Sequence, residues 1–246
     1  MKYFLANTIK GMGRQVGLEI SRMKSTIGVM EAFLGQLRDV GFQPSCVLDV
    51  GANKTEWSRL AKTYFPKARY ILIEPQAELV DGLKAFCAET PGSEWKLAGA
   101  GPEPGEMELA VWPDQAQSSF VVQPDGSAVF ERRRVPIITI DSLFEDGREL
   151  PQLAKLDIQG FELEALKGAN KLFGHTDCIV LEVNLFQRVS SVPQFSDVVS
   201  FFDERGYKVY DIAGELRRPL DNALWQVDLA FVQKGGRFDT CQRWQG

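Results

Sequence analysis

An acidic side chain lies near the end of each of the first two strand-like apolar runs of the sequence. The second follows the glycine after the first run at a spacing typical of a nucleoside-binding site. The run 46–50 carries Asp49 and leads into Gly51, and the run 70–73 leads into Glu74, 23 residues after Gly51. Glycine lets the backbone turn sharply and lets a ligand approach it closely. A carboxylate at the end of the second strand can accept hydrogen bonds from both hydroxyls of a ribose. The pair therefore indicates a cofactor that contains a nucleoside, unless this turn is an ordinary strand end that only caps the next helix.

The residues after Gly51 distinguish between classes of nucleoside cofactor. They read Ala52-Asn53-Lys54, whereas a dinucleotide site has the pattern G-x-G-x-x-G, whose later glycines admit a pyrophosphate at the start of a helix. A phosphate-binding G-x-x-x-x-G-K-[ST] loop is absent as well. Asp49 favours a cofactor that carries a cationic amino group in place of phosphates. S-adenosylmethionine, with adenine, ribose, a sulfonium and an ammonium, fits this pattern; a nicotinamide-dependent oxidoreductase on the same fold is the alternative.

A third acidic side chain, Asp157, lies at the end of the later apolar run 154–158. A carboxylate there can orient an acceptor hydroxyl, act as a base, or bind a cation together with Glu182 and Asn184. Oxygen ligands of this kind suit Mg²⁺, although no motif demands a metal. Methyl transfer to oxygen is an in-line displacement, so positioning alone can supply much of the catalysis. We predict Asp157 as the catalytic residue, with Glu182 and Asn184 on the acceptor side.

Strands and helices must alternate along the chain to position these side chains. Apolar runs predict strands at 46–50, 70–73, 94–98, 154–158, 178–183, 207–212 and 227–232, with helical spacing between most of them. Such βα units predict a parallel sheet covered by helices on both faces. No helical pattern separates the last two strands, so we expect them to pair antiparallel. The Gly- and Pro-punctuated section 100–140 predicts three short extra strands at 107–112, 120–122 and 135–140.

Composition and charge exclude several classes of protein. Of 246 residues, 44% are hydrophobic and 25% are charged, which is typical of a globular chain rather than a disordered one. The net charge is -5, and the acidic body of the chain is a poor candidate for binding nucleic acid. Four well-separated cysteines without a C-x-x-C pair indicate reduced thiols. We therefore expect a cytoplasmic protein.

The N-terminal 28 residues are basic and weakly amphipathic, with apolar side chains three to four residues apart. Such a helix can pack on the domain or on a second subunit of a homodimer, or bind peripherally to an anionic membrane surface, or stay disordered. No apolar run reaches the length of a membrane span. We divide the chain into a helical extension (1–42), a cofactor-binding domain (43–236) and a C-terminal tail (237–246).

Taken in order, the motifs resemble those of the FkbM-type family of S-adenosylmethionine-dependent methyltransferases. The resemblance runs from about residue 46 to residue 234 and rests on the segments 47–53 with Ser58, 73–75, 139–143, 155–162, 166–169, 181–184 and 228–232. It implies a class I Rossmann-like fold, that is, a mostly parallel seven-stranded sheet with an antiparallel last strand and helices on both faces. Two positions depart from the family pattern: Lys54 and Thr55 stand where a second glycine is usual, and Gln159 stands where an acidic residue is usual.

The resemblance also assigns roles to individual residues. It implies that Asp49, Gly51 and Asn53 hold the methionine end of the cofactor, that Glu74 binds the ribose, and that the loop around Ala98 and Gly99 lines the adenine. The remaining predicted cofactor contacts are Ala52, Ser58, Pro75 and Ser118. The implied activity is O-methylation of a hydroxyl on a small-molecule or glycan acceptor: a sugar, a glycolipid head group or a secondary metabolite. The alternative outside enzymology is a methyltransferase-like scaffold or binding subunit without activity.

Overall fold

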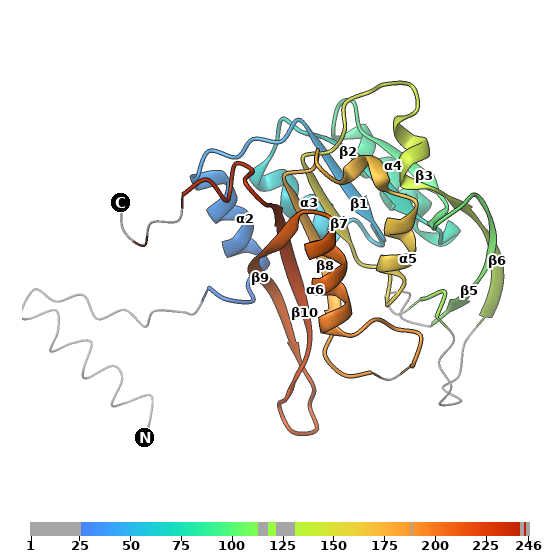
Figure 1. Ribbon diagram of the computed structural model, residues 1–246. Helices are drawn as coiled ribbons and strands as arrows, with labels where there is room; N and C mark the ends of the chain where they lie inside the picture. The colour runs from blue at the N-terminus through green and yellow to red at the C-terminus, as the bar shows by residue number, and fades with distance from the viewer. Residues whose placement is uncertain (1–25, 113–117, 122–130, 188, 242–243, 245–246) are drawn as a thin grey trace, which may run out of the picture.

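A seven-stranded, mostly parallel sheet forms the centre of the computed structural model, which describes residues 26–112, 118–121, 131–187, 189–241 and 244 (Figure 1). Its strand order is β3-β2-β1-β7-β8-β10-β9. The strands are β1 (Cys46–Val50), β2 (Arg69–Glu74), β3 (Glu94–Leu97), β7 (Leu153–Leu156), β8 (Cys178–Asn184), β9 (Tyr207–Arg217) and β10 (Leu224–Gln233). β10 runs antiparallel to both of its neighbours, and the other pairs are parallel. The predicted sheet, including the antiparallel last strand, is confirmed.

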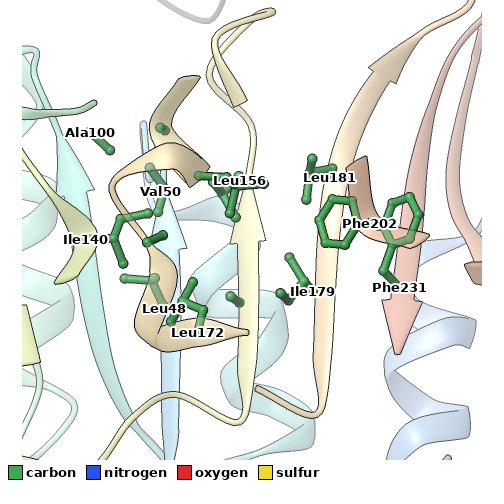
Figure 2. Close-up of a cluster of buried hydrophobic side chains, with 14 of the residues drawn as sticks. Leu48, Val50, Ala100, Ile140, Leu156, Leu172, Ile179, Leu181, Phe202 and Phe231 are labelled. Carbon is green, nitrogen blue, oxygen red and sulfur yellow. The ribbon is translucent and has the colours of Figure 1, made fainter. Parts of the chain in front are cut away.

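Helices cover both faces of this sheet because its central strands β1, β7 and β8 are buried on both sides. The helices α2 (Met30–Asp39), α3 (Glu56–Tyr64) and α4 (Val80–Ala88) bury Phe33, Ala61 and Leu83 against one face. The helices α5 (Glu162–Lys167) and α6 (Phe195–Glu204), with the 3₁₀ turns η2 (Ile140–Phe144) and η3 (Asn170–Leu172), cover the other. There Phe202 of α6 stacks on Phe231 of β10, with ring centroids 3.9 Å apart (Figure 2).

The section between β3 and β7 folds into a separate three-stranded sheet of order β4-β6-β5. Its strands are β4 (Gly99–Ala100), β5 (Gly105–Val111) and β6 (Glu131–Ile138), so two of the three extra strands are confirmed approximately in place. The third, at 120–122, is wrong over its described residues: only Ser119 forms a bridge, to Ala110, and the chain then bends. The Ser119 hydroxyl accepts the Val121 N–H, which turns the chain at this point, and the Phe120 ring packs against Phe161.

Segments near both ends of the described chain pack on the main domain. Leu34 and Leu37 of α2 are fully buried, and near the C-terminus Phe238 contacts the rings of Phe42 and Tyr210. Most of the predicted amphipathic N-terminal helix lies outside the described residues. Within the part of the chain that the structure describes, no helix has the length and apolarity needed to cross a membrane.

Strand order reverses between β1 and β7, since β1 continues to β2 on one side and β7 to β8 on the other. Connections leave in opposite directions at such a point, so a crevice opens at the carboxyl ends of the two strands. The polar residues singled out in the sequence lie at this edge of the sheet.

Candidate active site

A cleft opens at the carboxyl ends of β1, β2 and β7, and we call it the strand-end cleft. The described residues that line it are Val50, Gly51, Asn53, Ile73, Glu74, Pro75, Gln76, Ala98, Gly99, Ala100, Leu109, Ser118, Phe120, Asp157, Ile158 and Gln159. The turn after β1 is fixed on β2, because the N–H groups of Gly51 and Ala52 both donate to the Ile73 carbonyl at 2.9 and 3.1 Å. Gly51 has a φ of 84°, a left-handed conformation that glycine adopts without strain.

Glu74 lies at the end of β2 and is almost fully buried in the floor of this cleft. Its Oε2 accepts the Asn53 N–H at 2.8 Å, and its Oε1 accepts the backbone and side-chain N–H groups of Gln76 at 3.0 and 3.1 Å. Burial raises the pKa of Glu74, although these bonds oppose the shift. Since a carboxylate oxygen accepts about two hydrogen bonds, Oε2 retains capacity for one more from a ligand.

The far end of the cleft is formed by the second sheet and the loops beside it. Gly99 lies so close to Phe120 and Ile137 that a side chain at this position would overlap both. The Ser118 hydroxyl donates to the Gln76 side-chain oxygen at 3.0 Å. Ala98 and Gly99 thus lie beside an aromatic ring in a mostly apolar wall, the kind of surface that packs on a planar base.

Asp49 and Ser58, both predicted to contact the cofactor, lie beneath the cleft and are not among its lining residues. The Ser58 hydroxyl donates to Asp49 Oδ2 at 2.5 Å, and both side chains are buried. Burial raises the pKa of Asp49 to about 6, against the opposing effects of Lys155 and Ser58. Asp49 therefore acts on the site through its buried charge and through the position of α3, which carries Ser58.

A second hollow, which we call the adjoining cavity, shares a wall with the strand-end cleft. Its described lining residues are Gly51, Ala52, Asn53, Lys54, Glu56, Trp57, Lys155, Asp157, Gln159 and Glu182. It is the larger of the two spaces, with a volume of about 380 Å³, and it is open to solvent. Gly51, Asn53, Asp157 and Gln159 line both spaces, so a molecule in one space would contact a molecule in the other across them.

Lys155 lines the adjoining cavity and forms an ion pair with Asp157. Its ammonium donates to Asp157 Oδ2 at 2.6 Å and lies 5.9 Å from the centre of the Trp57 ring. Burial alone would lower the pKa of Lys155, but the carboxylates of Asp157, Asp49 and Asp228 outweigh it and raise the pKa. Lys155 thus stays charged among carboxylates that come from β1, β10 and the loop after β7.

These charges share one face of the sheet because side chains alternate along each strand. Val47, Leu153 and Val180 belong to the apolar cluster under α2, α3 and α4. The residues two positions further along their strands, Asp49, Lys155 and Glu182, therefore point to the same face at the strand ends. A polar layer replaces the apolar core only there, where the two hollows open.

Asp157 and Glu182 form a coupled pair of carboxyl groups. The Gln159 amide bridges them, since its Nε2 lies 3.2 Å from Asp157 Oδ1 and 3.2 Å from Glu182 Oε2, and Glu182 also hydrogen-bonds to Asp157. Burial would raise the pKa of Asp157, but Lys155 and these hydrogen bonds outweigh it and lower the pKa. Burial, followed by the charges of Asp157 and Glu162, raises the pKa of Glu182 well above its ordinary value. The pair therefore favours the state in which it binds one proton over the state in which both carboxyl groups are ionised.

Asn184 does not join Asp157 in the adjoining cavity. It lines a separate small cavity together with Glu162, Leu163, Glu182, Val183, Val192, Pro193 and Val198. Among the residues that the structure describes, no group of three or more His, Cys, Asp or Glu side chains is arranged to hold a metal ion. Of the three predicted oxygen ligands for Mg²⁺, Asp157 and Glu182 thus lie together without Asn184, and the Lys155 ammonium lies on the Oδ2 side of Asp157.

Glu162 holds the loop that carries Gln159. Its Oε1 accepts the N–H groups of Ile158 and Gly160 at 2.9 and 3.1 Å. Glu162 thereby fixes the backbone on both sides of Gln159. Burial raises the pKa of Glu162 from 4.5 to about 7. Because this folded-state pKa lies above the unfolded value, charged Glu162 reduces stability as the pH rises between about 4.5 and 7.

We expect Glu162→Gln to remove this pH dependence, because a glutamine oxygen can accept the same two bonds without a charge. The free energy of unfolding of the variant, relative to wild type, should rise by about 2–3 kcal/mol between pH 4.5 and pH 8. Urea unfolding followed by circular dichroism measures it. Glu164→Gln, on the exposed side of the same helix, is the matched control. A difference between Glu162→Gln and wild type that is constant with pH would show that Glu162 does not titrate in this window.

The residues of the site that were not predicted from the sequence include Trp57, Gln76 and Gln159. Trp57 has the spacing of a helix core residue and yet lines the adjoining cavity. Gln76 fixes the Glu74 carboxylate from two residues further along the chain. Gln159 was noted only as a departure from the family pattern. Gln159 has a φ of 58°, in the left-handed region that favours glycine. Such a conformation in a polar residue points to function in a structure, but the sequence does not show it.

Comparison with known proteins assigns the chain to a family. The model of the FkbM methyltransferase domain matches residues 49–209, which is more than half of the chain. A hexuronic acid methyltransferase, AglP from Haloferax volcanii, is 27% identical over 138 residues. That match covers 55% of this chain and 54% of AglP, so the chain spans about half the length of the relative it matches.

Solved structures of methyltransferases are similar over most of the chain at low sequence identity. A precorrin-6y C5,15-methyltransferase from Geobacter metallireducens is 16% identical and covers 88% of this chain and 94% of its own, with a TM-score of 0.44. An rRNA methylase from Streptococcus thermophilus is 9% identical and covers 87% and 99%, with a TM-score of 0.48. The sheet order and the match over residues 49–209 agree on a Rossmann-like class I methyltransferase fold. The chain belongs to the FkbM methyltransferase family.

Proposed function

We propose that this protein is an S-adenosylmethionine-dependent O-methyltransferase that modifies a sugar hydroxyl. The observation that carries the proposal is the pair of hollows at the strand-order reversal, which share Gly51, Asn53, Asp157 and Gln159 as a common wall. Two reactants held on either side of such a wall meet at short distance, and fixing their geometry is a large part of catalysis in group transfer.

The lining of the strand-end cleft fits S-adenosylmethionine. Its described residues include the carboxylates of Glu74 and Asp157 but no Lys or Arg, which suits a ribose and an ammonium and disfavours the phosphates of a nicotinamide dinucleotide. Glu74 would bind the ribose, the wall of Ala98, Gly99 and Phe120 would hold the adenine, and the turn at Gly51 and Asn53 would hold the methionine end. The cofactor supplies a methyl group on a positively charged sulfur.

The adjoining cavity fits a polyhydroxylated acceptor. Its described lining combines an indole, Trp57, with carboxyl, amide and ammonium groups on Asp157, Glu182, Gln159 and Lys54. Aromatic faces pack against the C–H surface of sugar rings, and such polar groups bind hydroxyls. The match to a hexuronic acid methyltransferase supports a sugar as the acceptor class. Asp157 would orient the hydroxyl toward the shared wall.

Binding of S-adenosylhomocysteine tests the cofactor. We expect micromolar binding by calorimetry, and an affinity about 10- to 100-fold lower in Glu74→Gln, because a charge-assisted hydrogen bond to a ribose hydroxyl is lost. Glu103→Gln changes an exposed glutamate near the second sheet and should bind like wild type. If wild type does not bind, the cofactor assignment fails, whereas equal binding by Glu74→Gln would remove only the role of Glu74.

A panel of acceptors tests the reaction. The protein is incubated with S-adenosylmethionine and with aryl glycosides of neutral hexoses and hexuronic acids, and mass spectrometry detects the gain of one methyl group. We expect methylation of at least one glycoside at a hydroxyl. Methylation confined to the carboxyl group of the uronides would overturn the assignment to oxygen of a hydroxyl, while leaving the cofactor intact.

A further inference from the structure

Asp157 and Glu182 of the adjoining cavity differ in whether a cation is paired with the carboxyl group. Asp157 has both oxygens bonded: Oδ2 accepts from the Lys155 ammonium, and Oδ1 accepts from the Gln159 amide. A carboxylate held in this way by a cation is a weak base. Glu182 accepts from the same amide and hydrogen-bonds to Asp157, but the described structure gives it no ion pair.

Glu182 also occupies a special place between two hollows. Of the described residues it is the one that lines both the adjoining cavity and the small cavity of Glu162 and Asn184. It is only 7% exposed, and the antiparallel register places Asp228 of β10 opposite it. A proton that reaches Glu182 from the acceptor side thus has a second cavity, with a second buried carboxyl, on the other side.

We propose that Glu182 is a catalytic residue, whose carboxylate takes the proton that the acceptor hydroxyl loses as its oxygen is methylated. In this step the bond from the acceptor oxygen to the methyl carbon forms and the bond from that carbon to sulfur breaks. The sulfur keeps the bonding electron pair and becomes a neutral thioether, and the hydroxyl proton moves to Glu182. The inference rests on the proposed function, because it requires a hydroxyl acceptor.

The groups around Glu182 explain why it, and not Asp157, would accept the proton. Asp157, Glu162 and Asp228 face it from the loop after β7, from α5 and from β10, and the Lys155 ammonium opposes their charge. A carboxylate among other carboxylates binds a proton more tightly, and a base is most effective when its pKa lies near the working pH. Lys155 and Asp157 act through Glu182, Asp157 as its hydrogen-bond partner and Lys155 by keeping Asp157 charged.

Glu182→Gln tests the proposal without disturbing the site. A glutamine has the shape of a protonated glutamic acid, can accept from Gln159, and can donate to Asp157, but it cannot take a proton. With the glycoside that the acceptor panel identifies, we expect kcat to fall by about 10²- to 10⁴-fold. KM and the affinity for S-adenosylhomocysteine should stay within about threefold, and the rise of kcat with pH in the wild type should disappear. Glu164→Gln, on the exposed side of α5, should behave like wild type throughout.

A kcat in Glu182→Gln within threefold of wild type, or an unchanged pH profile, would overturn the proposal. Failure of the wild type to bind S-adenosylhomocysteine would instead contradict the proposed function, so the two failures are distinguishable. If the panel yields no acceptor, carboxyl ¹³C NMR of glutamate-labelled protein decides, with Glu182→Gln assigning the resonance. We expect the Glu182 resonance to titrate well above the ordinary glutamate value of about 4.3 and to move in Asp157→Asn. Titration at the ordinary value would overturn the proposal.

Discussion

Lys155→Met is expected to lower the free energy of unfolding by about 3–5 kcal/mol, because it leaves Asp157, Asp49 and Asp228 without their shared cation. The Lys155 side chain is only 7% exposed, so water compensates poorly for loss of the ammonium. Methionine fills a similar volume and makes the loss of charge, rather than a cavity, the main effect. Urea unfolding at pH 7, followed by circular dichroism, measures the change.

Two further variants separate the charge from other effects. Lys167→Met removes the cation of a surface pair with Glu164, whose side chains are 53% and 45% exposed, and should cost less than about 1 kcal/mol. Lys155→Met combined with Asp157→Asn removes both partners of the buried pair and should recover part of the loss. If Lys155→Met costs no more than Lys167→Met, the polar layer is hydrated and the carboxylates do not depend on Lys155.

The sheet could be predicted from the sequence because its signals are local. Buried parallel strands such as β1 and β8 are short apolar runs bounded by turns, and the absence of a helical pattern before β10 predicts its antiparallel pairing. The described part of the 120–122 segment, residues 120–121, is equally apolar but does not form a strand. Its conformation is set by contacts distant in sequence, Phe120 with Phe161 and the Ser119 hydroxyl with the Gln159 carbonyl, which no local pattern reports.

The site was predicted in part for the same reason. Strand ends at a reversal of strand order must meet, so Glu74, Asp157 and Glu182 could be named from topology. Side-chain partnership could not be predicted in this way. No local pattern identifies Asp157 as the partner of Lys155. The predicted contact residue Asp49 lies beneath the cleft, because strand alternation places it toward α3 and Ser58.

Gly51→Ala should abolish micromolar binding of S-adenosylhomocysteine, lowering the affinity by about 100-fold or more. A methyl group at this position would overlap the carbonyl oxygen of Asp157, a backbone atom that cannot rotate away. The turn after β1 and the loop after β7 would have to separate, and these two segments form the wall shared by both hollows. A wall displaced in this way would no longer present Gly51 and Asn53 to the ligand in the native geometry. Calorimetry measures the affinity, and urea unfolding should show a stability loss of about 2–4 kcal/mol from overlap and backbone strain together.

Two other glycines separate the contributions of overlap and of backbone conformation. Gly147 has a φ of 74°, with nothing within 4 Å of an added methyl group, so Gly147→Ala carries the strain alone, about 1–2 kcal/mol, and should bind S-adenosylhomocysteine normally. Gly82 lies inside α4 with open space around it, and Gly82→Ala should stabilise the protein by about 0.5–1 kcal/mol. Normal binding by Gly51→Ala would mean that the two loops can move apart without loss of the site, and the shared wall would then not set the distance between donor and acceptor. Loss of binding in Gly51→Ala but not in Gly147→Ala ties affinity to the close approach of the β1 and β7 loops, the feature that brings two reactants together at this edge of the sheet.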